Sequence, residues 1–200
     1  KKLFQGKILS NWTTRISPAI DFLKSNHQIV KFCRANGMAK WLTNEFYIKY
    51  RPIVLLRHPF AVAASQLAEG AWSDVPEKFD IPNRPFNERY YHHADFLETI
   101  SSNPERLVAQ WCLTNGPLLH SNHHNAFIFV SYEELLQYPQ QTLSHLLKEW
   151  NVDVATDLGK FVRRPSSTVN QAEGVQVGEA QLGKWKTVFD SETRRSLIRI

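Results

Sequence analysis

The chain alternates short apolar runs with stretches in which apolar residues recur at helical spacing. The runs have the length and composition of strands, whereas the longer stretches fit amphipathic helices. The predicted strands are 28–33, 53–56 and 126–131. The predicted helices are 39–47, 90–100, 105–119 and 142–150, with a further helix from Ser191. The run Ile53–Leu56 is unbroken and begins with β-branched residues, which predicts a strand buried on both faces.

The strand at 53–56 ends in a charged residue and leads into another predicted helix. Arg57 follows the strand directly, so we expect its guanidinium at the carboxyl edge of a sheet. Pro59 suits the first helical position, because no hydrogen bond there needs its missing N–H. Helical spacing then places Ser65 on the same side of the helix as His58.

This strand-to-helix segment has the chemistry of a phosphate clamp. An arginine fork binds phosphate oxygens bidentately, a helix amino terminus adds positive potential, and a serine hydroxyl donates one more hydrogen bond. Phe60, Ala64 and Leu67 lie at core-facing spacing, and Ser65 lies one position beside them. The segment is equally compatible with a surface ion pair at Arg57 and a solvated Ser65, and the residues alone leave both interpretations open.

The predicted strand at 28–33 carries Lys31 among apolar neighbours. A lysine in a buried strand needs a partner for its charge, which favours a functional contact. The alternative is an ordinary lysine on an edge strand.

Composition narrows the class of protein. The 200 residues suit one domain, and the net charge of +5 favours anionic ligands. No basic run or zinc-ligand spacing indicates a nucleic-acid module. The two cysteines, Cys33 and Cys112, are too few for a disulfide framework, so a reducing, cytoplasmic location is expected. No apolar run approaches the ~20 residues of a membrane span, and no signal peptide is recognisable.

Histidines occur in two groups, His92-His93 and His120 with His123-His124. No carboxylate or thiolate completes a convincing zinc-ligand spacing around them, so we predict no metal site. The stretch 164–182 is polar and poor in large apolar residues, and we expect it to be weakly ordered when no nucleotide is bound.

Three segments together resemble the PAPS-dependent sulfotransferases. Residues 55–65 read Leu-Leu-Arg-His-Pro-Phe-Ala-Val-Ala-Ala-Ser, which is similar to the family's 3′-phosphate-binding segment. Residues 132–135 read Tyr-Glu-Glu-Leu and are followed by Pro139 and a predicted helix, as in the family. Residues 182–189 resemble its carboxyl-terminal Gly-x-Trp-Lys/Arg segment. The resemblance spans residue 28 to the end and keeps the family's order.

The resemblance implies a fold, a co-substrate and a reaction. The expected fold is a three-layer, P-loop-NTPase-like α/β domain over residues 1–200, with a central parallel sheet flanked by helices. The expected reaction transfers a sulfuryl group from PAPS (3′-phosphoadenosine 5′-phosphosulfate) to an acceptor hydroxyl and needs no metal. The expected acceptor is a small molecule or a glycan. No nucleic-acid partner is expected, and no membrane segment within the 200 residues. The oligomeric state is left open.

The resemblance also assigns cofactor-binding residues. Arg57 and Ser65 would hold the 3′-phosphate, and Lys31 would point at the phosphosulfate. Tyr132 would border the adenine, and Lys184 is a candidate for a further phosphate contact.

Two departures leave roles unassigned. Cys33 occupies the position at which many cytosolic relatives carry the catalytic histidine; we expect it to be a core thiol, and the general base is unknown. Gly178–Ala180 stand where those relatives have an Arg-Lys-Gly triplet that binds the 3′-phosphate. Arg163, Arg164 or Lys184 would then substitute for the triplet.

The family's amino-terminal 5′-phosphosulfate loop is absent from the 200 residues. We therefore expect the chain to be a fragment, incomplete at both ends and inactive by itself. Two other classes share the expected architecture. A P-loop-type kinase or nucleotide hydrolase would need an acidic Mg²⁺ ligand near the position of Arg57. A non-catalytic phosphonucleotide-binding module would keep the clamp and need no base.

Overall fold

A computed structural model describes residues 29–33, 35–70, 79, 81, 83, 87–120, 124–153 and 182–200. Contacts divide the chain into two compact units, Lys1–Ala35 and Asn36–Ile200, and each is described by itself. The expectation of one domain stays a prediction. The stretch 164–182 lies outside the described residues apart from Leu182, and so do Arg163, Arg164 and His123.

The first unit corrects one predicted strand. Residues 29–33 form no strand, and Ile29 is 87% exposed. A strand is stable only when its backbone N–H and C=O groups pair with a neighbour. None of the described residues forms strand hydrogen bonds with this run. Its apolar composition alone therefore does not make it a strand.

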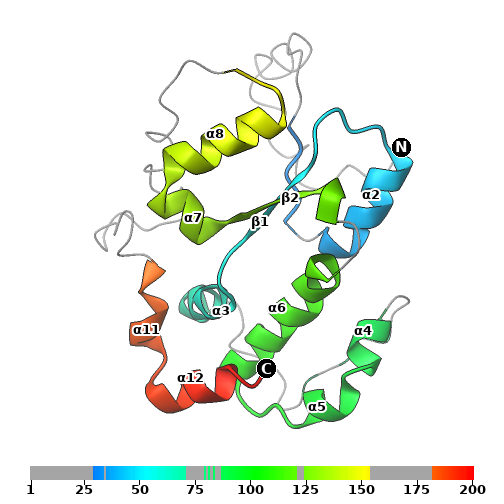
Figure 1. Ribbon diagram of the computed structural model, residues 1–200. Helices are drawn as coiled ribbons and strands as arrows, with labels where there is room; N and C mark the ends of the chain where they lie inside the picture. Colours follow the sequence, from blue (N-terminus) through cyan, green and yellow to red (C-terminus); the bar gives the residue numbers. More distant parts are fainter. Residues whose placement is uncertain are drawn as a thin grey trace, which may run out of the picture. The chain divides into compact units, whose positions relative to one another are not determined.

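The second unit combines helices with one small sheet (Figure 1). Its strands are β1 (Ile53–Leu56) and β2 (Ile128–Ser131). Its α-helices are α2 (Ala39–Glu45), α3 (Pro59–Ala68), α4 (Glu88–Tyr91), α5 (Ala94–Glu98), α6 (Asn103–Leu119), α7 (Tyr132–Gln137), α8 (Pro139–Glu149), α11 (Trp185–Val188) and α12 (Ser191–Leu197). The 3₁₀ turns are η2 (Asn36–Met38) and η3 (His124–Ala126).

The sheet is a parallel pair. β1 and β2 are in register from Ile53 opposite Ile128 to Leu56 opposite Ser131. Parallel strands need a long crossover, and α3 and α6 lie within this one. The mixed α/β character is confirmed. The expected three layers, with at least three strands, are not established by the residues described.

Burial of β1 differs from the prediction. Ile128 and Val130 of β2 are buried against Leu146 of α8. The register places Ile53 and Leu55 on the same face as these two residues, yet they are 37% and 53% exposed. Helix α8 therefore covers the β2 half of this face and leaves the β1 half open, so burial of β1 on both faces was wrong.

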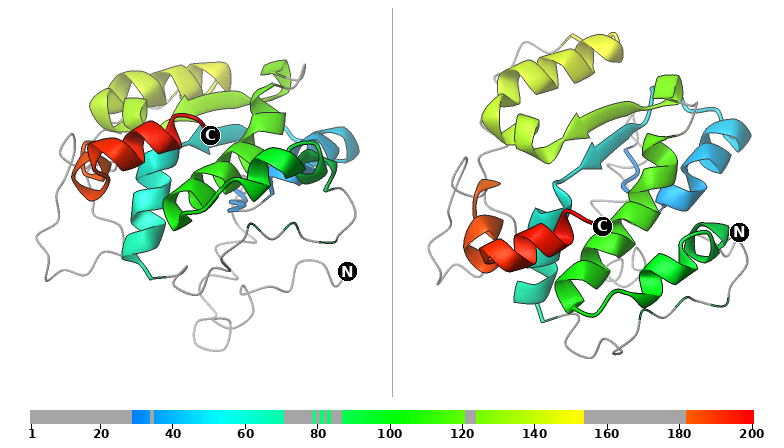
Figure 2. Two further views of the ribbon diagram at one scale, coloured as in Figure 1. Left: turned by 90° about the horizontal axis from the view of Figure 1, so that it is seen from below. Right: turned by 60° about the horizontal axis from the view of Figure 1, so that its bottom comes forward.

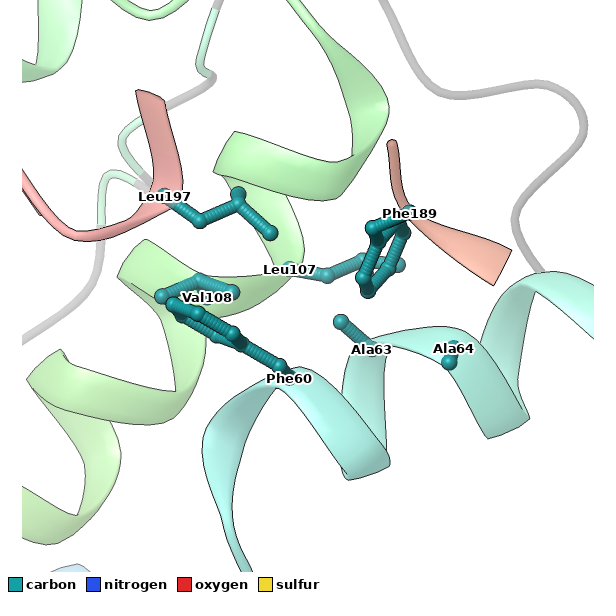
Figure 3. Close-up of a cluster of buried hydrophobic side chains, with 7 residues drawn as sticks. All are labelled: Phe60, Ala63, Ala64, Leu107, Val108, Phe189 and Leu197. Atoms are coloured by element: carbon teal, nitrogen blue, oxygen red, sulfur yellow. The ribbon is translucent and has the colours of Figure 1, made fainter. Parts of the chain in front are cut away.

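Away from the sheet, helix α6 contacts both α3 and α12 (Figure 2). The cluster between them is drawn in Figure 3 and consists of Phe60, Ala63, Ala64, Leu107, Val108, Phe189 and Leu197. The small side chains of Ala63 and Ala64 allow α3 to approach the other helices closely. The predicted core-facing spacing of α3 is confirmed, with Leu67 at the margin of this cluster.

The helix predicted at 90–100 is two short helices. Exposed His92 and His93 form a turn between α4 and α5, and histidine is a weak helix former. The buried Tyr90 and Leu97 still pack into one cluster with Leu113 of α6. The remaining predicted helices are present, with ends shifted by a few residues.

Candidate functional site

The carboxyl ends of β1 and β2 bring two predicted site residues together. Arg57 follows β1 and Tyr132 follows β2, and parallel pairing places both strand ends at one edge. The guanidinium carbon of half-buried Arg57 lies 4.9 Å from the centroid of the Tyr132 ring. This cation–π contact holds the guanidinium over an aromatic face while its N–H groups remain able to donate to an anion.

His58 organises the turn between β1 and α3. Its Nδ1 accepts a hydrogen bond from the backbone N–H of Phe60 at 3.2 Å and thereby caps α3. Its own backbone N–H donates to Glu133 Oε1 at 3.0 Å, so Glu133 braces the β1–α3 turn. Because Nδ1 accepts, the neutral ring carries its proton on Nε2.

The carboxyl-terminal segment reaches the same turn. The indole of Trp185 stacks on the His58 ring, with 4.9 Å between centroids and 9° between planes. Phe60 meets both rings edge-on. Lys186 Nζ lies 5.8 Å from the centroid of the Trp185 ring. Sequence reasoning missed His58 as an organiser; its position directly before a proline at the first helical position is the signal that could have found it.

Three influences set the charge of His58. The rings of Trp185 and Phe60 cover it in part, and this loss of water lowers its pKa below the ordinary 6.5. The Glu133 carboxylate opposes the shift, and the nearby Lys186 ammonium adds to it. The imidazole is therefore neutral at neutral pH, as its capping role requires.

We expect His58 to make folding stability depend on pH. Its pKa is lower in the folded state, so the unfolded chain binds more protons between that value and 6.5. The stability contributed by His58 is full above about pH 6.5 and falls as the pH drops through the lowered pKa. Urea denaturation from pH 7.5 down to pH 5 measures the slope, because the denaturation midpoint tracks stability.

His58→Asn separates this effect from other titrating groups. Asparagine is a good helix cap but does not titrate, so this variant should lose part of the wild-type slope. His145→Asn, on an exposed position of α8, is the matched control. Equal slopes for wild type and His58→Asn would contradict the assignment.

The other predicted residues have separate outcomes. Ser65 is a half-buried residue of α3, one turn after the buried Ala61. Lys184 is the residue before α11, and its carbonyl accepts a hydrogen bond from Thr187 Oγ1. Lys31 is exposed and belongs to the first unit. The convergence of Ser65 on Arg57 with Lys31 nearby stays a prediction, and so does a phosphate contact from Lys184.

Cysteine, metal and membrane features add little to this site. Cys33 is exposed, so its prediction as a core thiol was wrong: the run that carries it forms no strand and packs into no core cluster of the described residues. Cys112 is half-buried, and burial raises the pKa of its thiol. Where the structure is described, no three His, Cys, Asp or Glu side chains gather as metal ligands. None of the described helices has the length and apolar character needed to cross a bilayer.

Comparison of the chain with protein-family models, curated proteins and solved structures gives no match.

Proposed function

We propose that the protein is a PAPS-dependent sulfotransferase whose 3′-phosphate site lies at the carboxyl edge of β1 and β2. The observation that carries the proposal is the Arg57 guanidinium at the end of a parallel strand, held over the Tyr132 ring and followed directly by α3. Open α/β sheets bind ligands at this edge. The proposed complete fold is the three-layer, P-loop-NTPase-like domain, and the proposed location is the cytoplasm.

Each residue has a distinct role in the proposed complex. Arg57 binds the 3′-phosphate with two parallel N–H donors, and the amino terminus of α3 contributes positive potential. Ser65 donates one hydrogen bond, and Tyr132 borders the adenine. His58 keeps α3 capped and neutralises no part of the bound anion, because its ring is uncharged.

The proposed reaction is an in-line transfer. The acceptor hydroxyl oxygen forms a bond to the sulfur of PAPS, and the bond from sulfur to the bridging phosphate oxygen breaks. The leaving group is 3′-phosphoadenosine 5′-phosphate, and the hydroxyl proton passes to a base that the described residues do not identify. Cationic donors stabilise the charge that develops on the leaving phosphate.

Nucleotide discrimination tests the proposal. The full-length protein should bind 3′-phosphoadenosine 5′-phosphate about ten- to a hundredfold more tightly than AMP, because one charge-assisted contact is worth about 1.5–3 kcal/mol. Calorimetric titration of both nucleotides measures this ratio. Equal affinities would reject the proposal. Release of phosphate from ATP with Mg²⁺ would favour a kinase or hydrolase, and discrimination without sulfuryl transfer would favour a binding module.

A further inference from the structure

We propose that Lys186 is an additional anion-binding side chain of the Arg57 site, and that the stack of Trp185 on His58 positions it there. This inference deepens the proposed function and rests on it. The sequence points to Lys184 as the cation of this segment, whereas the contacts favour its neighbour two positions later.

The stack indicates which lysine of this segment lies near His58. Trp185 is the first residue of α11, and its ring lies nearly parallel to that of His58. Lys186 Nζ lies 5.8 Å from the centroid of the same indole, so Trp185 has both the His58 ring and the Lys186 ammonium as neighbours. Residues two apart in a helix point about 160° apart, and Lys184 directly precedes α11 with helical φ and ψ. Because the charge of Lys186 acts on His58, we expect Lys184 to lie on the opposite side of the helix.

The charges around His58 leave a positive balance for an anion. Arg57 is its chain neighbour, and Lys186 is close enough for its charge to act on the imidazole. Glu133 is the opposing carboxylate, and one of its oxygens already accepts the backbone N–H of His58. Two cations against one engaged carboxylate favour a phosphate dianion over a neutral ligand.

The stack of Trp185 on His58 is also connected to the hydrophobic core. Phe60 contacts both rings of the stack edge-on, and it is itself a member of the buried cluster in Figure 3. Helix α11 contacts α3, the helix that begins after His58. An ammonium held by such a surface loses less side-chain entropy on binding than a lysine on a free loop.

Two lysine substitutions test the inference. In the full-length protein, Lys186→Gln should weaken binding of 3′-phosphoadenosine 5′-phosphate about tenfold while changing AMP affinity much less. Lys148→Gln, at an exposed position of α8, is the control and should leave both affinities unchanged. Calorimetric titration of the two nucleotides against the three proteins gives the comparison.

A second variant tests positioning. Trp185→Leu removes the stack but keeps the ammonium, so it should weaken binding of the 3′-phosphorylated nucleotide in the same direction. Combining it with Lys186→Gln should add little, because both changes remove one contact. Full additivity would overturn the positioning role.

The outcomes separate the two proposals. A wild type that prefers the 3′-phosphorylated nucleotide, with Lys186→Gln keeping that preference or Lys148→Gln losing it equally, overturns the role of Lys186 alone. A wild type without preference overturns the proposed function and this inference together.

Discussion

Arg57→Ala is expected to remove most of the preference for 3′-phosphoadenosine 5′-phosphate over AMP. The loss should be about ten- to a hundredfold for the former, because a charge-assisted contact from arginine is worth about 1.5–3 kcal/mol. AMP lacks the phosphate that Arg57 is proposed to hold, so its affinity should change little. Ser65→Ala should act in the same direction more weakly. Calorimetric titration in the full-length protein measures both affinities.

Arg51→Ala is the matched control at the opposite end of the same strand. Arg51 precedes β1, pairs with Glu149 and donates to the carbonyl of Phe127 at 2.7 Å. Its contacts fasten the amino edge of the sheet, so its removal should lower stability without changing nucleotide preference. If Arg51→Ala and Arg57→Ala reduce the preference equally, the effect is general destabilisation and the clamp assignment fails.

Phe60→Ala is expected to have the largest effect on stability, a loss of about 3–5 kcal/mol in the free energy of unfolding. Phe60 is 8% exposed and packs in the cluster between α3 and α6 (Figure 3). Its ring also contacts Trp185 edge-on. The substitution leaves a cavity that the packed helices cannot close fully. Urea denaturation followed by circular dichroism measures the change.

Phe96→Ala provides the comparison. Phe96 lies in α5 and is 40% exposed, so its truncation should cost about 1 kcal/mol or less. A similar loss at both positions would mean that the cluster around Phe60 is not the core it is taken to be.

Local rules predicted the segment around β1 and α3 well. A charged residue ending an apolar run, a proline at the first helical position and a 3.6-residue apolar period each depend only on near neighbours. The amino terminus of α6 is similar. Ser102 and Glu105 form a reciprocal capping box there, and Pro104 lies in the first turn, so the helix begins at Asn103, two residues before the predicted start.

Predictions that depended on partners from elsewhere in the chain were less secure. The run at 29–33 has strand composition but pairs with none of the described residues. Burial of β1 depended on how much of the sheet α8 covers, which periodicity within β1 cannot reveal. The contact of His58 with Trp185 is a tertiary contact with no local signature. The position of Arg57 at the end of β1 was predictable; its contact with the Tyr132 ring was not.

The stack of Trp185 on His58 has a consequence for the order in which the protein is made. Trp185 comes 127 residues after His58, so the ribosome must add a long stretch of chain after His58 before both rings exist. The pair also closes a long loop, and contacts of high sequence separation form late because they must first overcome the entropy of closure. The β1–α3 turn can therefore fold early around its own cap and proline, whereas the surface carrying Lys186 is completed last. A nascent chain released before residue 185 would have Arg57 in place but no stack beside it.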